Sequence, residues 1–214
     1  MGGAVIHATR LYELIGLFVG LPILGFIIAN SEPSLVFLLL AVVGCGCVCV
    51  LWKDQSFKRK RLWQLKDARE HLLKSLRLFI PLASVIAAWV YFLLPELFLS
   101  LPAHQTEFWL VTLLIYPLIS VIPQELIFHT YFSHCYKPLF PSKYTRLWVS
   151  SFLFGLAHSI YGNWIAVVGS WGCGLLFGYR YIQSRSTAIV VIEHTLWGSF
   201  IFTIGLGAFV LLEV

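Results

Sequence analysis

The chain has 214 residues, of which 59% are hydrophobic and 12% are charged, and its formal net charge is +5. Soluble domains carry about 25% charged residues, so this composition excludes a soluble globular domain and places most of the chain in lipid. The length is that of one domain. The basic residues lie beside apolar segments, so we do not interpret the positive charge as nucleic-acid binding.

Seven apolar stretches follow one another, and most approach or exceed the ~20 residues that a helix needs to cross a bilayer. The pattern predicts an all-α fold, a polytopic membrane helix bundle of about seven or eight transmembrane helices. A turn is expected at Tyr161-Gly162-Asn163, and a kink or split at Gly205 and Gly207. The stretches cover residues 11–30, 34–52, 76–98, 107–132, 147–161, 163–182 and 187–212.

We divide this single membrane domain into N-terminal transmembrane helices, residues 1–106, and a C-terminal helix bundle, residues 107–214. In the N-terminal part, Lys58-Arg59-Lys60-Arg61 begins a segment in which leucines recur at near-helical spacing. The spacing predicts a basic amphipathic helix within a cytoplasmic loop, about residues 53–75, that lies on anionic lipid headgroups.

The positions of the basic residues predict the orientation. Nine of the fifteen Lys and Arg residues lie between Lys53 and Arg77, and the others precede the first stretch or fall near alternate loops, Arg180 and Arg185 among them. By the positive-inside rule, the N-terminus and these loops face the cytoplasm. The compact length and the lack of a eukaryotic targeting signal favour a bacterial inner membrane.

Glu125, His158 and His194 each interrupt a different apolar stretch. An ionisable side chain in the bilayer costs at least ~2.5 kcal/mol on insertion scales, so such residues usually mark functional sites. A helix rise of ~1.5 Å per residue gives the three compatible depths, and we expect one shared intramembrane site. His129 follows Glu125 by four residues and can hydrogen-bond to it. Glu193 points about 100° away from His194, toward a neighbouring helix.

The chemistry open to these residues is narrow. A carboxylate and a His can activate water by general-base catalysis, and a second His can donate to the developing oxyanion. The alternative is a zinc ion held by Glu125, His158 and His194, with water as the fourth ligand. Both describe hydrolysis of a peptide bond, or acyl transfer, inside the membrane. We expect no cofactor, because ligand type is the only reason to prefer zinc and no H-E-x-x-H motif occurs.

Residues from about 107 to 205 resemble the CPBP family, which includes type II CAAX prenyl endopeptidases and the ABI proteins of bacteriocin processing and self-immunity. That family carries E-E-x-x-x-R, F-x-x-x-H and H-x-x-x-N motifs on successive transmembrane helices. Here they correspond to Gln124-Glu125-Leu126-Ile127-Phe128-His129, Phe154-Gly155-Leu156-Ala157-His158 and His194-Thr195-Leu196-Trp197-Gly198. The resemblance implies a helical intramembrane protease with a glutamate-activated water. In the family, the first Glu is the base, the second motif's His assists it, and the third motif stabilises the oxyanion.

Three positions depart from the family pattern. Gln124 stands in place of the first Glu, His129 in place of the Arg, and Gly198 in place of the Asn. Gln cannot act as a base at neutral pH, so the chemistry shifts to Glu125 or is absent. A one-residue shift rotates the carboxylate by about 100°. A helix deformation near Pro123 would partly correct that rotation.

The leading hypothesis is therefore an intramembrane endopeptidase that cleaves a membrane-anchored or lipid-modified protein or peptide. Glu125 is then the general base with His158 as its partner, and His194 donates to the oxyanion. Gln124 orients water or substrate, and His129 supports Glu125. The complete set of supporting residues is Gln124, His129, Phe154 and Gly198.

Two other function classes fit the same residues. A non-catalytic relative that binds, protects or scaffolds a membrane partner, as in immunity to a bacteriocin, fits the missing Glu, Arg and Asn. A small transporter with Glu125 and Glu193 on its path fits the pair of acids, although the chain shows no repeated halves. The expected partners in every case are the lipid bilayer and a membrane-bound molecule, and no nucleic acid.

Overall fold

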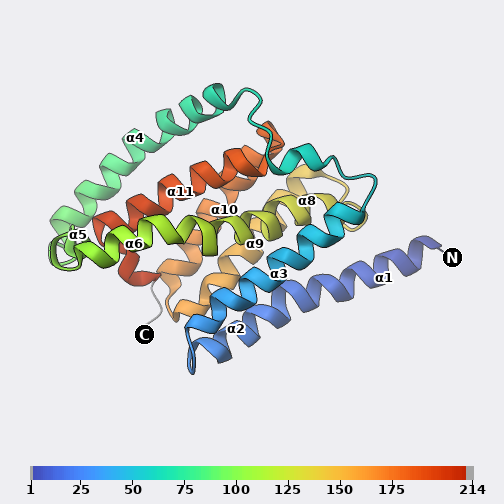
Figure 1. Ribbon diagram of the computed structural model, residues 1–214, viewed down its shortest axis with the longest axis horizontal. Coiled ribbons are helices and arrows are strands. Elements are labelled where there is room, and N and C mark those ends of the chain that lie inside the picture. The colour runs from blue at the N-terminus through green and yellow to red at the C-terminus, as the bar shows by residue number, and fades with distance from the viewer. Residues whose placement is uncertain (1, 211–214) are drawn as a thin grey trace.

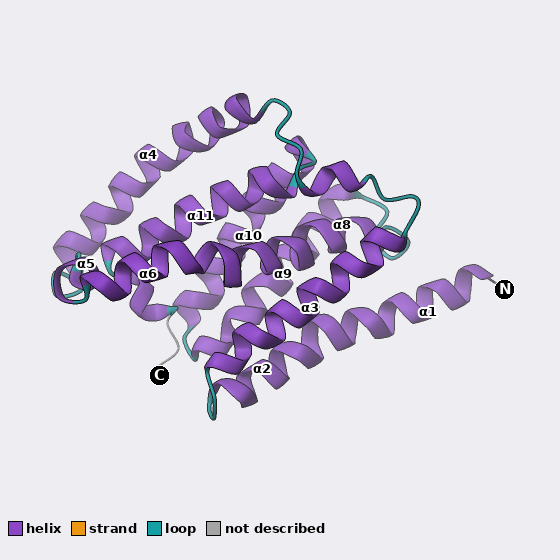
Figure 2. Cartoon of the chain, in the orientation of Figure 1, coloured by secondary structure: helices purple, strands orange, loops and turns teal. Residues whose placement is uncertain are grey.

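The computed structural model describes residues 2–210, with side chains from residue 7 onward. Within that range every regular element is helical, and the helices pack as one bundle (Figures 1 and 2). In chain order the elements are α1 (Gly2–Ile15), η1 (Gly16–Gly20), α2 (Leu21–Ala29), α3 (Ser34–Lys53), η2 (Arg59–Leu62), α4 (Ala68–Leu93), α5 (Ser100–His104), α6 (Thr106–Tyr116), η3 (Pro117–Val121), α7 (Ile122–Gln124), η4 (Glu125–Tyr131), α8 (Phe132–Cys135), α9 (Lys143–Ala157), η5 (His158–Tyr161), α10 (Trp164–Ser184), α11 (Thr187–Ile204) and η6 (Leu206–Phe209).

The prediction of a polytopic helical membrane protein is confirmed. Six helical runs of the described chain are long and apolar enough to cross a bilayer. The 15-residue helix α9 is shorter than a membrane span and packs inside the bundle against α10. The six runs are His7–Ala29, Ser34–Lys53, Ala68–Leu93, Thr106–Cys135, Trp164–Ser184 and Thr187–Ile204.

The amphipathic helix expected over residues 53–75 is present only from Ala68 onward, as the start of α4, and is wrong for the residues before it. Residues 54–67 form turns around the short helix η2, and α4 begins only at Ala68. The loop makes tertiary hydrogen bonds that a helix would break. Arg59 donates to the carbonyl oxygen of Trp52 at 2.7 Å, and Gln64 donates to that of Arg185 at 2.7 Å. These bonds also satisfy backbone groups at two helix ends.

The long run from α6 to α8 is not a uniform α-helix. It widens into π-helical turns at Pro117–Val121 and again at Glu125–Tyr131. The deformation expected near Pro123 is therefore present on both sides of that residue. Short π-helical segments are frequent at functional sites because they re-aim side chains. Here α3 packs closely, and a Cβ on Gly44 would lie 3.1 Å from Cβ of Pro123.

Helices α9 and α10 form a closely packed pair that small residues make possible. A Cβ on Gly155 would lie 2.8 Å from Cβ of Trp171, and a Cβ on Gly174 would lie 3.1 Å from Cα of Ser151. Glycines at such positions let two membrane helices approach. The turn predicted between these helices is present, with Gly162 at φ +67°.

The last apolar stretch divides as expected. Helix α11 ends where Gly205 adopts φ +98°, and the short helix η6 follows it. The end of the predicted stretch, at residue 212, lies outside the described residues.

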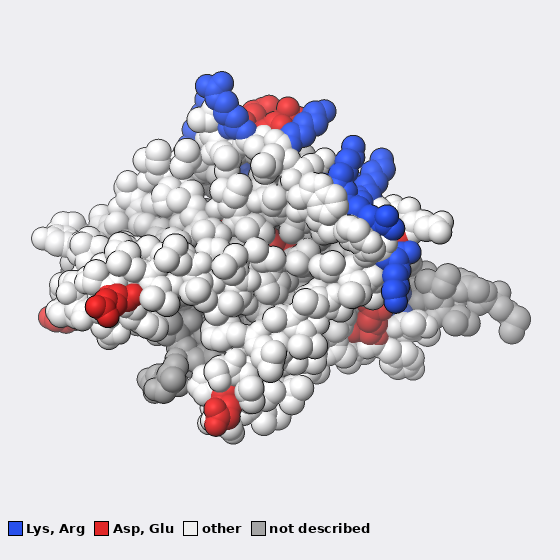
Figure 3. All heavy atoms as spheres, viewed as in Figure 1, with Lys and Arg blue, Asp and Glu red and all other residues white. Residues whose placement is uncertain are grey.

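Lys and Arg gather at the end of the molecule where α4 begins and where the α3–α4 connection lies (Figure 3). Arg180 is an exception to the expected positions in loops. It is buried within α10, where its Nε lies 2.6 Å and its Nη2 3.1 Å from the two carboxylate oxygens of Glu193. This charge balances a buried acid, so it is not evidence of membrane orientation.

Candidate active site

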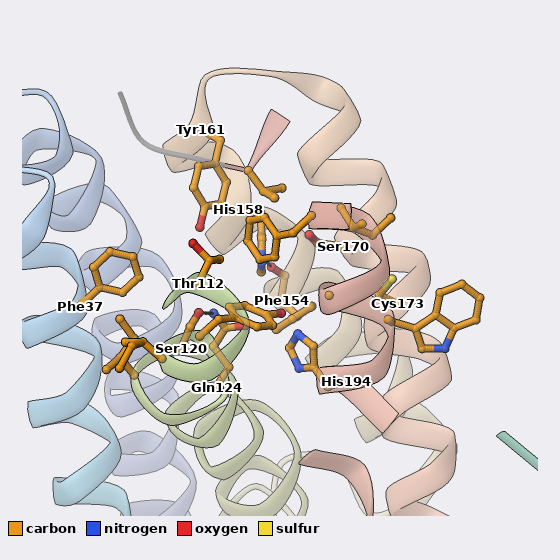
Figure 4. Close-up of a pocket in the computed structure, with 18 of the residues that line it drawn as sticks. Phe37, Thr112, Ser120, Gln124, Phe154, His158, Tyr161, Ser170, Cys173 and His194 are labelled. Atoms are coloured by element: carbon orange, nitrogen blue, oxygen red, sulfur yellow. Dashed lines mark hydrogen bonds between the residues drawn. The ribbon is translucent and has the colours of Figure 1, made fainter. Parts of the chain in front are cut away.

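A pocket of about 370 Å³ lies between α3, the α6–α7 run, α9–η5, α10 and α11 (Figure 4). Its size is within the range of small-molecule and peptide sites. Most of the lining is apolar, so an apolar segment of a membrane molecule suits it. The polar lining includes Thr112, Tyr116, Ser120, Gln124, His158, Tyr161, Ser170 and His194.

Glu125 lies behind this pocket rather than on its surface. Its side chain is fully buried, and both carboxylate oxygens accept hydrogen bonds from imidazoles. Oε2 lies 2.6 Å from Nδ1 of His129, and Oε1 lies 2.7 Å from Nδ1 of His194. The π-helical turn that begins at Glu125 places it between these two rings. From the sequence we expected the Glu125 carboxylate to contact the water directly. In the structure it lies behind the pocket, and His194 is the residue that faces the pocket.

His129 has a hydrogen-bond acceptor at each ring nitrogen. Nδ1 faces Glu125, and Nε2 lies 3.3 Å from the carbonyl oxygen of Gly174. Each ring nitrogen therefore faces an oxygen that can accept a hydrogen bond from it. Room for the ring depends on Gly178, where a Cβ would lie 3.1 Å from Cδ2 of His129. Glu125 and His129 thus form a buried hydrogen-bonded pair.

His194 is held so that one nitrogen is free. Its Nδ1–H donates to Glu125, which leaves Nε2 as the unprotonated nitrogen when the ring is neutral. The ring stacks on Phe177 with centroids 4.4 Å apart, and Phe154 meets it edge-on at 5.9 Å. His194 lines the pocket, so its free nitrogen has access to a bound molecule (Figure 4).

His158 adds a second imidazole to the same pocket. Its Nδ1 lies 2.7 Å from the carbonyl oxygen of Phe154 and must donate, so the lone pair is on Nε2. Its ring packs on Phe154 at 4.6 Å. Phe154 therefore contacts the rings of His158, His194 and, at 6.1 Å, His129.

Gln124 also lines the pocket, one residue before the buried carboxylate. Its Nε2 donates to Oγ of Ser120 at 2.8 Å. With the amide nitrogen directed at Ser120, Oε1 is left as an acceptor for water or substrate.

Comparison with known proteins supports one assignment. Residues 105–200 match the family model described as "Type II CAAX prenyl endopeptidase Rce1-like". Over these residues the chain is similar to the Rce1-like family. No curated protein and no solved structure matches the chain.

The Rce1-like segment contains all three sequence motifs, and the fold brings them to one place. The first motif supplies Gln124 to the pocket and Glu125 behind it. The second supplies His158, and the third supplies His194. His129, at the position of the family's Arg, is a hydrogen-bond partner of Glu125. Gly198 lines the pocket without a side chain.

The zinc alternative was tested against these positions. Among the described residues no three His, Cys, Asp or Glu side chains are placed to hold a metal ion. Both oxygens of Glu125 are already occupied by imidazole nitrogens. Glu125 would have to give up one of those bonds to become a ligand, so the three predicted residues do not fit zinc in this arrangement.

Sequence reasoning missed two residues that shape the site. Tyr116 and Phe177 line the pocket and pack against the His194 ring. Both are aromatic residues in apolar stretches, where a packing role is the ordinary interpretation. The sequence offered one indication of Tyr116. Glycine at position 198 leaves space beside His194, and a side chain from another helix had to fill that space.

Proposed function

We propose that the protein is an intramembrane endopeptidase that hydrolyses a peptide bond in a membrane-anchored or lipid-modified protein. The observation that supports this most directly is the Glu125–His194 hydrogen bond of 2.7 Å, which leaves Nε2 of His194 at the pocket. The Rce1-like family match agrees with it.

In the proposed mechanism, Glu125 activates water through His194. The carboxylate holds His194 in the tautomer with a free Nε2 and stabilises the imidazolium that forms, which is the part a buried Asp plays in serine proteases. Nε2 of His194 takes a proton from water as the oxygen attacks the scissile carbonyl carbon. Collapse of the tetrahedral intermediate breaks the C–N bond, and the amine leaves with that proton.

The other polar groups position the water. The lone pair on Nε2 of His158 and Oε1 of Gln124 are both acceptors on the pocket surface. A water that donates to one of them and to His194 directs its own lone pair at the carbonyl. His129 holds the second carboxylate oxygen of Glu125, which fixes the carboxylate in place beside His194.

We place the chain in a bacterial inner membrane with the N-terminus in the cytoplasm. The gathering of Lys and Arg at one end of the bundle supports this orientation. The partners are then the bilayer and the substrate protein, and no cofactor takes part.

One observation favours a second candidate, a non-catalytic protein that binds or protects a membrane partner. Within the described chain no Asp or Glu lines the pocket, because Gln124 occupies the surface position and Glu125 lies behind it. A transporter is less favoured, because Glu193 is paired with Arg180 and does not reach the pocket.

The experiment is a comparison of membrane proteins in the native host. Proteins with C-terminal membrane tails are sized by mass spectrometry in wild type, in a deletion strain, and in strains with Glu125→Gln or His194→Ala. His104→Ala is the control, since this exposed His bonds only to the carbonyl oxygen of Ser100. The same uncleaved precursor should accumulate in the deletion and in both site variants. Variants that behave like wild type, beside a deletion that does not, would favour the binding protein.

A further inference from the structure

Tyr116 is the last residue of α6, and its side chain packs against α11. Its ring centroid lies 6.1 Å from that of His194 and 5.1 Å from that of Phe202. Tyr116 lines the pocket, and its hydroxyl makes no hydrogen bond to any residue that the structure describes. An O–H in such a position is a donor without a partner, which is unusual for a partly buried tyrosine.

The hydroxyl occupies the space that a side chain at position 198 would fill. A Cβ on Gly198 would overlap the Tyr116 hydroxyl oxygen and would lie 2.5 Å from Cε1 and 2.6 Å from Cζ. Gly198 follows His194 by four residues, so the two positions share one face of α11. The Tyr116 hydroxyl therefore lies beside His194, one helical turn along.

The donors that the three motifs bring to the pocket are already engaged within the protein. The Nδ1–H groups of His158 and His194 are directed at protein acceptors, and the amide nitrogen of Gln124 donates to Ser120. Tyr161 lies at the opposite end of the pocket from His194 (Figure 4).

We propose that the Tyr116 hydroxyl donates a hydrogen bond to the oxygen of the scissile carbonyl as it becomes the oxyanion. This inference rests on the proposed endopeptidase function. When the water oxygen bonds to the carbonyl carbon, the π electron pair moves onto the carbonyl oxygen, and the Tyr116 O–H stabilises that charge without giving up its proton. The negative charge returns to the C=O bond when the C–N bond breaks. The donor is in place beforehand because Phe202 and the surface of α11 fix the ring.

The test uses the full protein in liposomes, with the precursor that accumulates in the deletion host as the probe. Tyr116→Phe removes one oxygen that has no partner in the described chain, so folding should be unaffected. We expect kcat to fall about 10²–10³-fold with little change in KM, as is usual when one oxyanion donor is lost. Tyr179→Phe is the matched control, since that tyrosine is exposed on α10 away from the pocket.

A second set of variants asks whether a donor from position 198 can replace Tyr116. Gly198→Asn alone should be inactive, because its side chain overlaps the Tyr116 ring. Tyr116→Ala combined with Gly198→Asn opens that space and supplies an amide donor, so it should recover at least about tenfold of the kcat lost in Tyr116→Ala. Recovery by Gly198→Ala in the same background would mean that filling the space, rather than donating, is what matters.

The outcomes separate this inference from the proposed function. If His194→Ala abolishes cleavage while Tyr116→Phe keeps the wild-type kcat, the Tyr116 assignment is overturned and the endopeptidase stands. If wild type and His194→Ala give the same precursor and product, the endopeptidase itself fails, and the Tyr116 role fails with it.

Discussion

Glu125 and His194 are 69 positions apart in the sequence, yet Oε1 of the first lies 2.7 Å from Nδ1 of the second. The bond joins the first and third motifs across two helices, and it turns two buried polar residues into one unit. The Glu125 carboxylate lies behind the His194 ring, and the ring itself lies at the pocket. A bound molecule therefore meets His194 and not Glu125. The chemistry occurs on the His194 side, and Glu125 acts through it.

The first prediction concerns the proposal that Glu125 acts through His194. Glu125→Gln should lower kcat by about 10²–10⁴-fold, because an amide no longer selects the tautomer with a free Nε2. In a His194→Ala background the same change should cost nothing further, since residues that act as one unit are not additive. Turnover of the precursor in liposomes measures both. Glu107→Gln, at an exposed site in the first turn of α6, is the control. A further large loss in the double variant would mean that Glu125 reaches the water directly.

The second prediction concerns the buried pair of Glu125 and His129. His129→Ala leaves the Glu125 carboxylate with one partner and removes the contact with the Gly174 carbonyl. Leaving a buried hydrogen-bonding group without a partner typically costs about 1–3 kcal/mol, and more when that group is charged. Thermal unfolding in detergent should show a large drop in the midpoint. Lys74→Ala is the control, because its pair with Glu70 is exposed and should leave the midpoint unchanged. Equal midpoints in the two variants would contradict the buried hydrogen-bonded pair of Glu125 and His129.

The third prediction concerns metals. Both oxygens of Glu125 are engaged by imidazoles, so the proposed hydrolysis needs no metal ion. Dialysis against a strong chelator should leave the cleavage rate unchanged, and added zinc should not raise it. His158 and His194 offer two free nitrogens, so excess zinc is expected to inhibit by occupying them. Loss of activity with chelator and its recovery with zinc would establish the metal-dependent alternative instead.

Much of the fold was predictable, because lipid demands long apolar helices and the breaks in them carry glycine or basic residues. The polar residues of the site were predictable as well, since burying them is costly. What could not be predicted was which helices are neighbours. Hydropathy does not show that Glu193 pairs with Arg180, which removes both from the site.

The roles within the site depended on details that periodicity does not carry. The π-helical turn at Glu125 sets whether Gln124 or the carboxylate faces the pocket. The helical spacing of leucines that begins at Leu62 predicts a helix from the loop onward, but residues 54–67 form turns, and the Gln64 side chain ties this loop to the carbonyl oxygen of Arg185. Tyr116 was missed because its position follows from an absent side chain at Gly198.

The fourth prediction concerns acid stability at the basic end of the molecule. Oδ2 of Asp54 lies 2.7 Å from Nε2 of His134, and the backbone N–H of Ser56 donates to Oδ1 at 2.8 Å. The hydrogen bond from His134, followed by those from Ser56, lowers the pKa of Asp54 to about 2. The unfolded pKa is near ~3.9, so this contribution is complete above that pH and is lost as pH falls from about 4 to about 2.

Asp54→Asn should therefore flatten the acid side of the stability curve without changing it at low pH. The side chain of Asp54 is 37% exposed, so solvent screening keeps the effect below about 1 kcal/mol. Unfolding midpoints measured from neutral pH down to about pH 2 test this. Glu32→Gln, in the α2–α3 turn, is the control because that side chain forms no hydrogen bond or ion pair within the described chain. A parallel downward shift of the whole curve would indicate lost packing rather than a lost charge.

The fifth prediction uses three glycines to separate backbone strain from steric overlap. Gly205 has φ +98°, and a Cβ there would overlap the carbonyl oxygen of Leu97 and lie 2.6 Å from its carbon. Gly162 has φ +67° with nothing within 4 Å, and Gly46 lies within α3 with nothing within 4 Å. Alanine should stabilise by about 0.5–1 kcal/mol at Gly46, since a helix interior favours it. At Gly162 it should destabilise by about 1–2 kcal/mol, the cost of the left-handed conformation.

Gly205→Ala should be the most destabilising of the three, because strain and overlap add there. The overlap forces α11 away from the segment that contains Leu97, and α11 carries His194 and Gly198 into the pocket. Activity should therefore fall along with the unfolding midpoint, whereas Gly162→Ala should lower the midpoint with a smaller effect on turnover. If Gly205→Ala were as stable as Gly46→Ala, the sharp end of α11 at Gly205 would be contradicted, and with it the position of the helix that supplies the third motif.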